Sequence, residues 1–137
     1  MRTTDADTLA LLRRARARIA DPEHWCQGQE ALDADMQPVG PNDPAAVYWC
    51  ALGAMRAEFA LVDREKFEQD GSGELDLLNK CAADYAESVD ADYATGRPCL
   101  TEVNDLGSHT AVLAVYDAAI DVIAVCDAVI AELKSAC

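Results

Sequence analysis

Cysteine and histidine are the residue types in this chain that could carry chemistry. Cys26 follows His24 by two positions, and Cys50 and His109 supply a second thiol and a second imidazole. A thiol becomes a nucleophile when an imidazole within hydrogen-bond reach takes its proton and a third polar group orients that imidazole. The Asn104–Asp105 pair could supply the third group. A cysteine-dependent enzyme is therefore the alternative function that the sequence allows.

The same two thiols belong to two Trp-Cys pairs that stand 24 residues apart, on either side of a connector rich in Pro and Asp. We expect Cys50 to lie about two turns inside a helix, away from the helix N-terminus that would lower its pKa, among apolar neighbours that raise it. Buried free thiols pack as small hydrophobic groups. We therefore predict a structural joint and no catalytic residue; the joint consists of Trp25, Cys26, Trp49, Cys50 and Gly53.

The sequence does not indicate a metal site. None of the six cysteines forms a Cys-x-x-Cys pair, and His24 with Cys26 has no second ligand pair at zinc spacing. Asp33, Asp35 and Gln37 are spaced like the start of a calcium loop, but the glycine and the glutamate that complete such a loop are missing. No phosphate-binding glycine loop or nucleotide motif is present. We expect no metal and no cofactor.

Charge is distributed unevenly along the chain. Residues 1–18 contain five arginines and two aspartates, whereas residues 19–137 contain six bases and 23 acids, and the total is −14. Such a surface repels nucleic acids and anionic membranes over most of its area. We expect no direct binding of nucleic acid or membrane. A basic protein surface is the partner that fits this charge, although acidity also serves solubility alone.

The N-terminus lacks the features of a secretion signal, because acids occur at Asp5 and Asp7 and four arginines lie between Arg13 and Arg18. No run of 18 uncharged apolar residues is present that could cross a bilayer. We therefore expect a cytoplasmic protein whose thiols are free.

Apolar spacing predicts a mainly α-helical single domain over residues 1–137, a compact bundle of about four helices. One short β-hairpin could form near residues 29–39, where four turn-forming residues separate Ala31-Leu32 from Gln37-Pro38-Val39. The helices are expected at about residues 5–20, from Asp43 to Val62, from about Ser72 to the Gly96-Arg97-Pro98 stop, and from about Ser108 onward.

The predicted helix from Asp43 to Val62 has small side chains on one face and large ones on another, which indicates a buried central helix. Gly53 costs about 1 kcal/mol relative to Ala inside a helix. We expect this cost to be offset by a close backbone contact, with another helix packed on the small face.

The predicted third helix has one apolar face and one acidic, solvated face. We expect the acidic face to be the binding surface of a non-enzymatic accessory protein. Its residues are Asp76, Asp84, Glu87, Asp90 and Asp92.

The last predicted helix carries an apolar heptad pattern from Val112 to Leu133. A two-stranded coiled coil has charges beside such a stripe, whereas here the flanking positions are apolar as well. We expect this helix to lie in the core of the domain, with a homodimer through residues 109–135 as a further possibility.

Several motifs together resemble those of a small uncharacterised family found in bacterial and phage genomes. They are Ile19-Ala20-Asp21-Pro22, His24-Trp25-Cys26-Gln27-Gly28, the WCALGA segment within residues 41–54, Asn104-Asp105, and the Val112-Leu113 and Tyr116-Asp117 pairs. Residues 63–98 depart most from the family. The resemblance implies a compact helical domain of phage or mobile-element origin and no known activity. One concrete function of that kind is inhibition of a host complex by blocking its basic, nucleic-acid-binding surface.

Overall fold

The computed structural model describes residues 5–61, 72–88 and 98–136, with side chains described for 7–61, 75–88 and 98–125. The fold is mainly helical, as predicted, and contains one small antiparallel sheet. Its elements in chain order are α1 (Asp5–Arg18), the 3₁₀ turn η1 (Pro22–His24), β1 (Ala31–Leu32), β2 (Tyr48–Trp49), α2 (Ala51–Phe59), α3 (Ser72–Ser88), α4 (Leu100–Leu106) and α5 (His109–Ala136).

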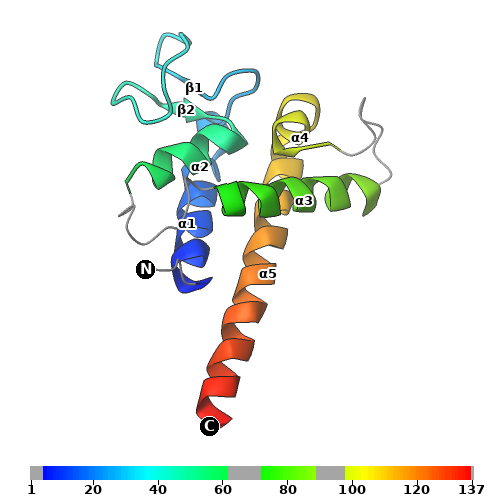
Figure 1. Cartoon of the computed structure of the whole chain (residues 1–137). Helices are drawn as coiled ribbons and strands as arrows, with labels where there is room; N and C mark the ends of the chain where they lie inside the picture. The colour runs from blue at the N-terminus through cyan, green and yellow to red at the C-terminus, as the bar shows by residue number, and fades with distance from the viewer. Residues whose placement is uncertain (1–4, 62–71, 89–97, 137) are drawn as a thin grey trace.

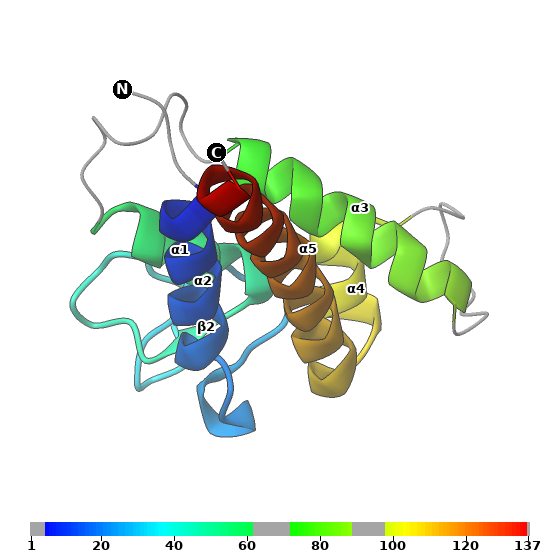
Figure 2. The same cartoon turned by 90° about the horizontal axis from the view of Figure 1, so that it is seen from below.

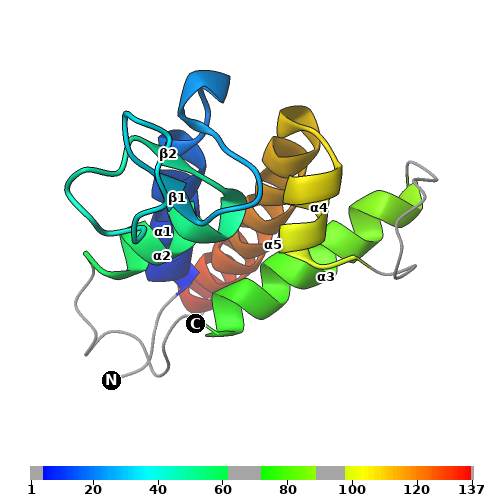
Figure 3. The same cartoon turned by 90° about the horizontal axis from the view of Figure 1, so that it is seen from above.

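The long helix α5 is the axis of the molecule (Figure 1). Helices α1 and α3 pack against its first half from two sides, as the view along α5 also shows (Figure 2). The sheet and α2 lie at the α1 side, while α4 lies at the α3 side (Figure 3). The second half of α5 extends beyond the other described elements (Figure 1).

One apolar core joins all five helices, because each of them contributes buried side chains. Fully burying a Leu or Ile side chain stabilises the fold by about 1.5–3 kcal/mol. The largest fully buried apolar side chains are Leu11, Leu12 and Ile19 of the α1 region, Leu78 of α3, Leu100 and Val103 of α4, and Val112, Val115 and Tyr116 of α5.

The predicted helix from Asp43 to Val62 is wrong in its first part. Asp43 begins a turn instead, because its carboxylate accepts a hydrogen bond from the Ala45 amide at 2.8 Å and its carbonyl accepts one from the Ala46 amide at 3.0 Å. An Asp-Pro pair is as suitable for such a turn as for a helix start. The aromatic residues that follow form β2, and α2 begins only at Ala51. Val62 lies outside the described residues.

The turn predicted within residues 29–39 is present, but its sheet has a different partner. The Asp33 carboxylate accepts hydrogen bonds from the Asp35 and Gln37 amides, both at 2.9 Å, and a single bridge joins Leu32 to Pro38. Two backbone hydrogen bonds flank this bridge, from the Asp33 amide to the Gln37 carbonyl at 2.9 Å and from the Val39 amide to the Ala31 carbonyl at 3.1 Å. The two-stranded sheet itself forms between β1 and β2, where Ala31 lies opposite Trp49.

The segment expected to connect the last two helices contains the short helix α4. Its seven residues offer too few apolar positions to show a helical period. α5 then begins where expected, and the Ser108 hydroxyl accepts a hydrogen bond from the Ala111 amide at 3.1 Å. Among the described residues no helix is both long enough and apolar enough to cross a membrane.

Candidate functional site

Asn104 is the centre of the joint that contains the two Trp-Cys pairs. Its side chain is fully buried, and its amide oxygen accepts hydrogen bonds from the Trp25 indole at 2.6 Å and from the Ala51 amide at 2.9 Å. Its amide nitrogen donates to the Cys26 carbonyl at 3.0 Å and to the Asp105 carboxylate at 2.9 Å. The amide thus uses both its donors and both its lone pairs, and joins three segments that are distant in sequence.

The Gln27-Gly28 pair binds the end of α4. The Gln27 side-chain amide donates to the Asn104 carbonyl at 2.9 Å, and the Gly28 amide donates to the Asp105 carboxylate at 2.9 Å. Gly28 has φ +84°, a conformation that residues with a side chain rarely adopt. The first Trp-Cys motif and the Asn-Asp motif are therefore two halves of one hydrogen-bonded contact.

The close backbone contact predicted for Gly53 is present, but the backbone that approaches it belongs to Glu30 and not to another helix. A Cβ atom at position 53 would lie 1.8 Å from the Glu30 carbonyl oxygen. The Cys50 amide donates to that same oxygen at 3.1 Å. Only glycine leaves room for the chain before β1 at the start of α2.

Trp49 connects the sheet to α1. Its indole donates to the Pro41 carbonyl at 2.9 Å, and the guanidinium of Arg18 lies over its ring, 4.6 Å from the centroid. Its own carbonyl accepts from the Cys26 amide at 3.0 Å. All five residues predicted for the joint thus lie at the meeting point of the sheet, α2 and α4.

The two thiols of the joint are buried and bonded to backbone groups. Cys26 donates to the Gln29 carbonyl at 3.4 Å, and burial, with smaller contributions from Cys50 and Asp105, raises its pKa to about 12. Cys50 is the N-cap of α2, where its sulfur accepts from the Gly53 amide at 3.3 Å. The expectation that Cys50 lies inside a helix is therefore wrong. Its pKa is nevertheless raised, because burial outweighs the amides that stabilise the thiolate.

Both imidazoles bind backbone carbonyls. His109 Nε2 lies 2.7 Å from the Ile19 carbonyl oxygen. The His109 ring packs against the Trp25 ring, and the two ring centroids are 5.4 Å apart. His24 Nδ1 lies 3.2 Å from the Val47 carbonyl. No thiol is hydrogen-bonded to an imidazole in the parts of the chain that the structure describes, and Asn104 orients Trp25 instead. The geometry does not assemble the constellation of a cysteine-dependent enzyme.

Three of the four arginines of α1 form ion pairs within the chain. Arg14 and Arg18 both bind the carboxylate of Glu58, which is buried in α2, and the Nε atoms lie 3.0 and 2.9 Å from its oxygens. Arg16 binds Asp117 of α5 at 2.6 Å. These ion pairs therefore hold the arginine-rich helix α1 against α2 and α5.

Asp76, Asp84 and Glu87 are exposed on α3, as expected for the acidic face. Lys80 lies on the same face and binds Asp84 at 2.7 Å. Two further members predicted for this face, Asp90 and Asp92, lie outside the described residues. Across the described residues no group of three or more His, Cys, Asp and Glu side chains is arranged to hold a metal ion.

Sequence reasoning missed the central role of Asn104, which it considered only as a group that could orient an imidazole. The sequence held one indication of this role: Asn104-Asp105 is among the motifs that the chain shares with the family it resembles. A hydrogen-bond partner 79 positions away, such as Trp25, leaves no local pattern.

A family of unknown function, DUF6197, matches residues 3–131 of this chain. This agrees with the expected kinship to an uncharacterised family, while the bacterial or phage origin stays a prediction. No curated protein and no solved structure gives a significant match.

Proposed function

We propose that this chain, which belongs to the DUF6197 family of unknown function, is a non-enzymatic acidic protein of the cytoplasm that binds a basic surface of a protein partner. The observation that carries the proposal is the pairing of Arg14, Arg16 and Arg18 of α1 with Glu58 and Asp117. Three of the four cationic side chains of α1 are thus neutralised by carboxylates of the same chain. The chain has a net charge of −14, so the remaining, unneutralised acidic side chains make its surface negative.

The motif residues support this interpretation because each has a structural partner. The Trp-Cys pairs, the Gln-Gly pair and the Asn-Asp pair bind one another, and the thiols carry raised pKa values. An active-site cysteine requires the opposite shift. Residues that resemble an active site in the sequence therefore act as a joint, and the function is assigned to the surface.

The acidic face of α3 is the proposed contact surface. Asp76, Asp84 and Glu87 lie within about 80° of one another around the helix axis. They form a row, with Lys80 among them bound to Asp84, along one side of a helix whose other side packs on α5. A row of carboxylates on a rigid helix can occupy a groove that otherwise binds a phosphate backbone. We propose that inhibition of such a host complex is the biological role, in keeping with a phage or mobile-element origin.

A charge-reversal experiment tests the proposal. The partner is first captured from the native host with the wild-type chain, and its affinity is then measured at several salt concentrations. We expect Asp76→Lys with Glu87→Lys to weaken binding about tenfold or more, because attraction to a basic surface becomes repulsion. We also expect the captured partner to lose bound nucleic acid as the wild-type chain is added.

The matched control is Thr101→Lys with Thr110→Lys and Asp121→Lys, which changes the net charge equally at exposed positions on α4 and α5. This control should leave the affinity within about threefold. The proposal fails if the α3 variant and the control weaken binding equally, or if neither does.

A further inference from the structure

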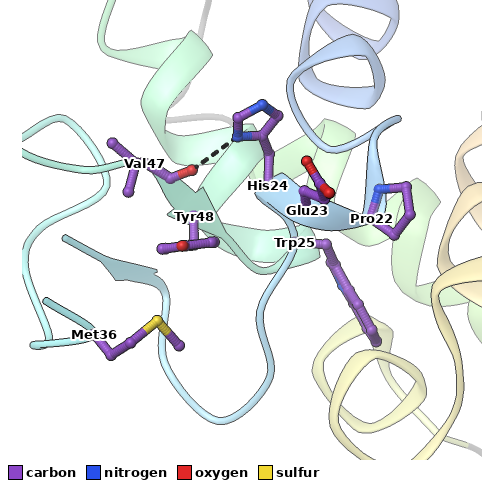
Figure 4. A pocket seen from close by; sticks show the side chains of 7 residues that line it. All are labelled: Pro22, Glu23, His24, Trp25, Met36, Val47 and Tyr48. Carbon is purple, nitrogen blue, oxygen red and sulfur yellow. Dashed lines mark hydrogen bonds between the residues drawn. The ribbon is translucent and has the colours of Figure 1, made fainter. Parts of the chain in front are cut away.

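A depression of about 530 Å³ lies between η1, β2 and the turn after β1 (Figure 4). Its volume is in the range of pockets that hold small ligands or single side chains. It lies apart from the acidic face of α3. The hydrogen bonds of the joint are complete without a ligand in the depression. The residues that line it are Pro22, Glu23, His24, Trp25, Met36, Val47 and Tyr48.

The wall formed by η1 is fixed before any ligand arrives. The Asp21 carboxylate accepts from the Glu23 amide at 2.9 Å, and the Asp21 carbonyl accepts from the His24 amide at 2.9 Å. A bridge between Trp25 and Trp49 then ties this turn to β2. A ligand would therefore meet a wall that needs little ordering, which reduces the cost of binding.

The polar groups of the depression are mainly acceptors. A carbonyl can only accept a hydrogen bond, so the His24 Nδ1 that faces the Val47 carbonyl carries the proton, and in the neutral ring Nε2 is an acceptor. The Glu23 carboxylate is exposed, and it forms no hydrogen bond or ion pair with the described part of the chain. Among the described residues that line the depression there is no Lys or Arg.

Tyr48 adds an aromatic ring to this lining, and the residue is partly buried. The ring of Trp25 points away from the depression toward α4, where its indole N–H binds Asn104 (Figure 4). An aromatic ring and acceptors without a lysine or arginine beside them are an environment that attracts a positively charged group.

Met36 lies at the edge of the depression opposite Pro22 (Figure 4). Its side chain is 56% exposed, and its φ of +64° is unusual for a residue other than glycine. The Asp33 turn holds it there, since the Met36 amide donates to the Asp33 carbonyl at 3.0 Å. The turn thus holds an exposed, polarisable thioether at the edge of the depression, where a ligand could contact it.

We propose that this depression binds the guanidinium group of an arginine side chain from a protein partner. Arginine fits because its planar cation is weakly hydrated, stacks on aromatic rings and donates several hydrogen bonds to a carboxylate. The chain uses the same chemistry internally, where Arg18 lies over Trp49 and binds Glu58. The inference rests on the proposed function and names a specific site within it.

An NMR titration with a defined probe tests the assignment. The probe is N-acetyl-arginine methylamide, and N-acetyl-citrulline methylamide is its neutral isostere. We expect the arginine probe to shift the Met36 methyl, His24 ring and Tyr48 ring signals, and to bind at least about fivefold more tightly than the citrulline probe. Glu23→Gln should weaken the arginine probe by a similar factor. Tyr48→Leu, which keeps the carboxylate, should also weaken it.

Glu87→Gln on α3 is the matched control and should leave probe binding unchanged. The assignment is overturned if the citrulline probe binds as tightly as the arginine probe, or if the signal shifts are confined to α3. It is also overturned if the corresponding lysine probe, N-acetyl-lysine methylamide, binds more tightly than the arginine probe. The two experiments together distinguish a failure of this site from a failure of the proposed function. If the arginine probe does not bind while charge reversal on α3 still weakens the partner, only the depression is wrong. If the probe binds but α3 charge reversal has no effect, the acidic-face proposal is wrong and the site remains.

Discussion

A single side chain, Asn104, joins segments that are far apart in the sequence because an amide has two donors and two lone pairs. Trp25 and Ala51 bind its oxygen, and the Cys26 carbonyl binds its nitrogen. Its buried side-chain polar atoms all have hydrogen-bond partners, as do the buried side-chain nitrogen and oxygen atoms of the other described residues. The hydrogen bonds of this residue explain why the Trp-Cys and Asn-Asp motifs occur together in one chain.

Gly53 gives a test at the same scale. Gly53→Ala would place a methyl group 1.8 Å from the Glu30 carbonyl oxygen, a backbone atom that cannot move without disturbing β1. We expect a loss of roughly 3 kcal/mol or more in the free energy of unfolding, measured by urea denaturation.

The control is Gly40→Ala, where the added carbon would lie at an ordinary 3.6 Å from Asn42. This variant should stay within about 0.5 kcal/mol of the wild type. Equal stability of the two variants would show that the close approach at Gly53 does not exist in solution.

At the scale of elements, the arginines of α1 show how a sequence feature can be reassigned by packing. A helix with several arginines could bind phosphate, but here Arg14 and Arg18 meet one buried carboxylate of α2. A buried carboxylate without its cations is strongly destabilised. The ion pair therefore fixes the register between α1 and α2, and the Glu58 carboxylate offsets part of the positive charge of α1.

Glu58→Gln tests this contact between elements. The substitution keeps the shape of the side chain but removes its charge, and the two arginines are partly exposed, which moderates the effect. We expect a loss of about 1–3 kcal/mol in the free energy of unfolding, measured by chemical denaturation at low salt.

Asp117→Asn is the matched control, because it removes a carboxylate that also pairs with an α1 arginine but is half exposed. It should cost less than about 1 kcal/mol. If Asp117→Asn were as destabilising as Glu58→Gln, burial would not be the reason for the effect.

At the scale of the whole molecule, α5 divides into two parts. Val112, Val115, Tyr116 and Ala119 are fully buried in the chain's own core. Beyond them Val125 is 62% exposed, and the helix extends past the other described elements (Figure 1). A homodimer through residues 109–135, which the sequence left open as a possibility, would therefore use the later part of that range.

Sedimentation velocity over a wide concentration range tests this prediction. We expect the wild type to dimerise and Val125→Glu to raise the dimer dissociation constant about thirtyfold, since a charge would be buried between apolar helices. Thr110→Glu adds the same charge at an exposed position near the start of α5 and should not change association. A wild type that stays monomeric at the highest concentration would contradict the prediction.

The sequence by itself determined the helical class, the first and last helices and the acidic surplus. These follow from local periodicity and from composition, which do not depend on distant contacts. It also indicated that Gly53 needed a close backbone neighbour, because glycine inside an apolar helix has a known cost.

Only the tertiary structure decided the start of α2, the partner of β1 and the role of Asn104. Asp43-Pro44 is compatible with a turn or a helix start, and the choice was made by pairing of Tyr48–Trp49 with Ala31–Leu32. The α1 arginines likewise became internal ion-pair partners because Glu58 lies beside them in space. Contacts between residues so far apart depend on how the helices pack, and no local pattern in the chain encodes them.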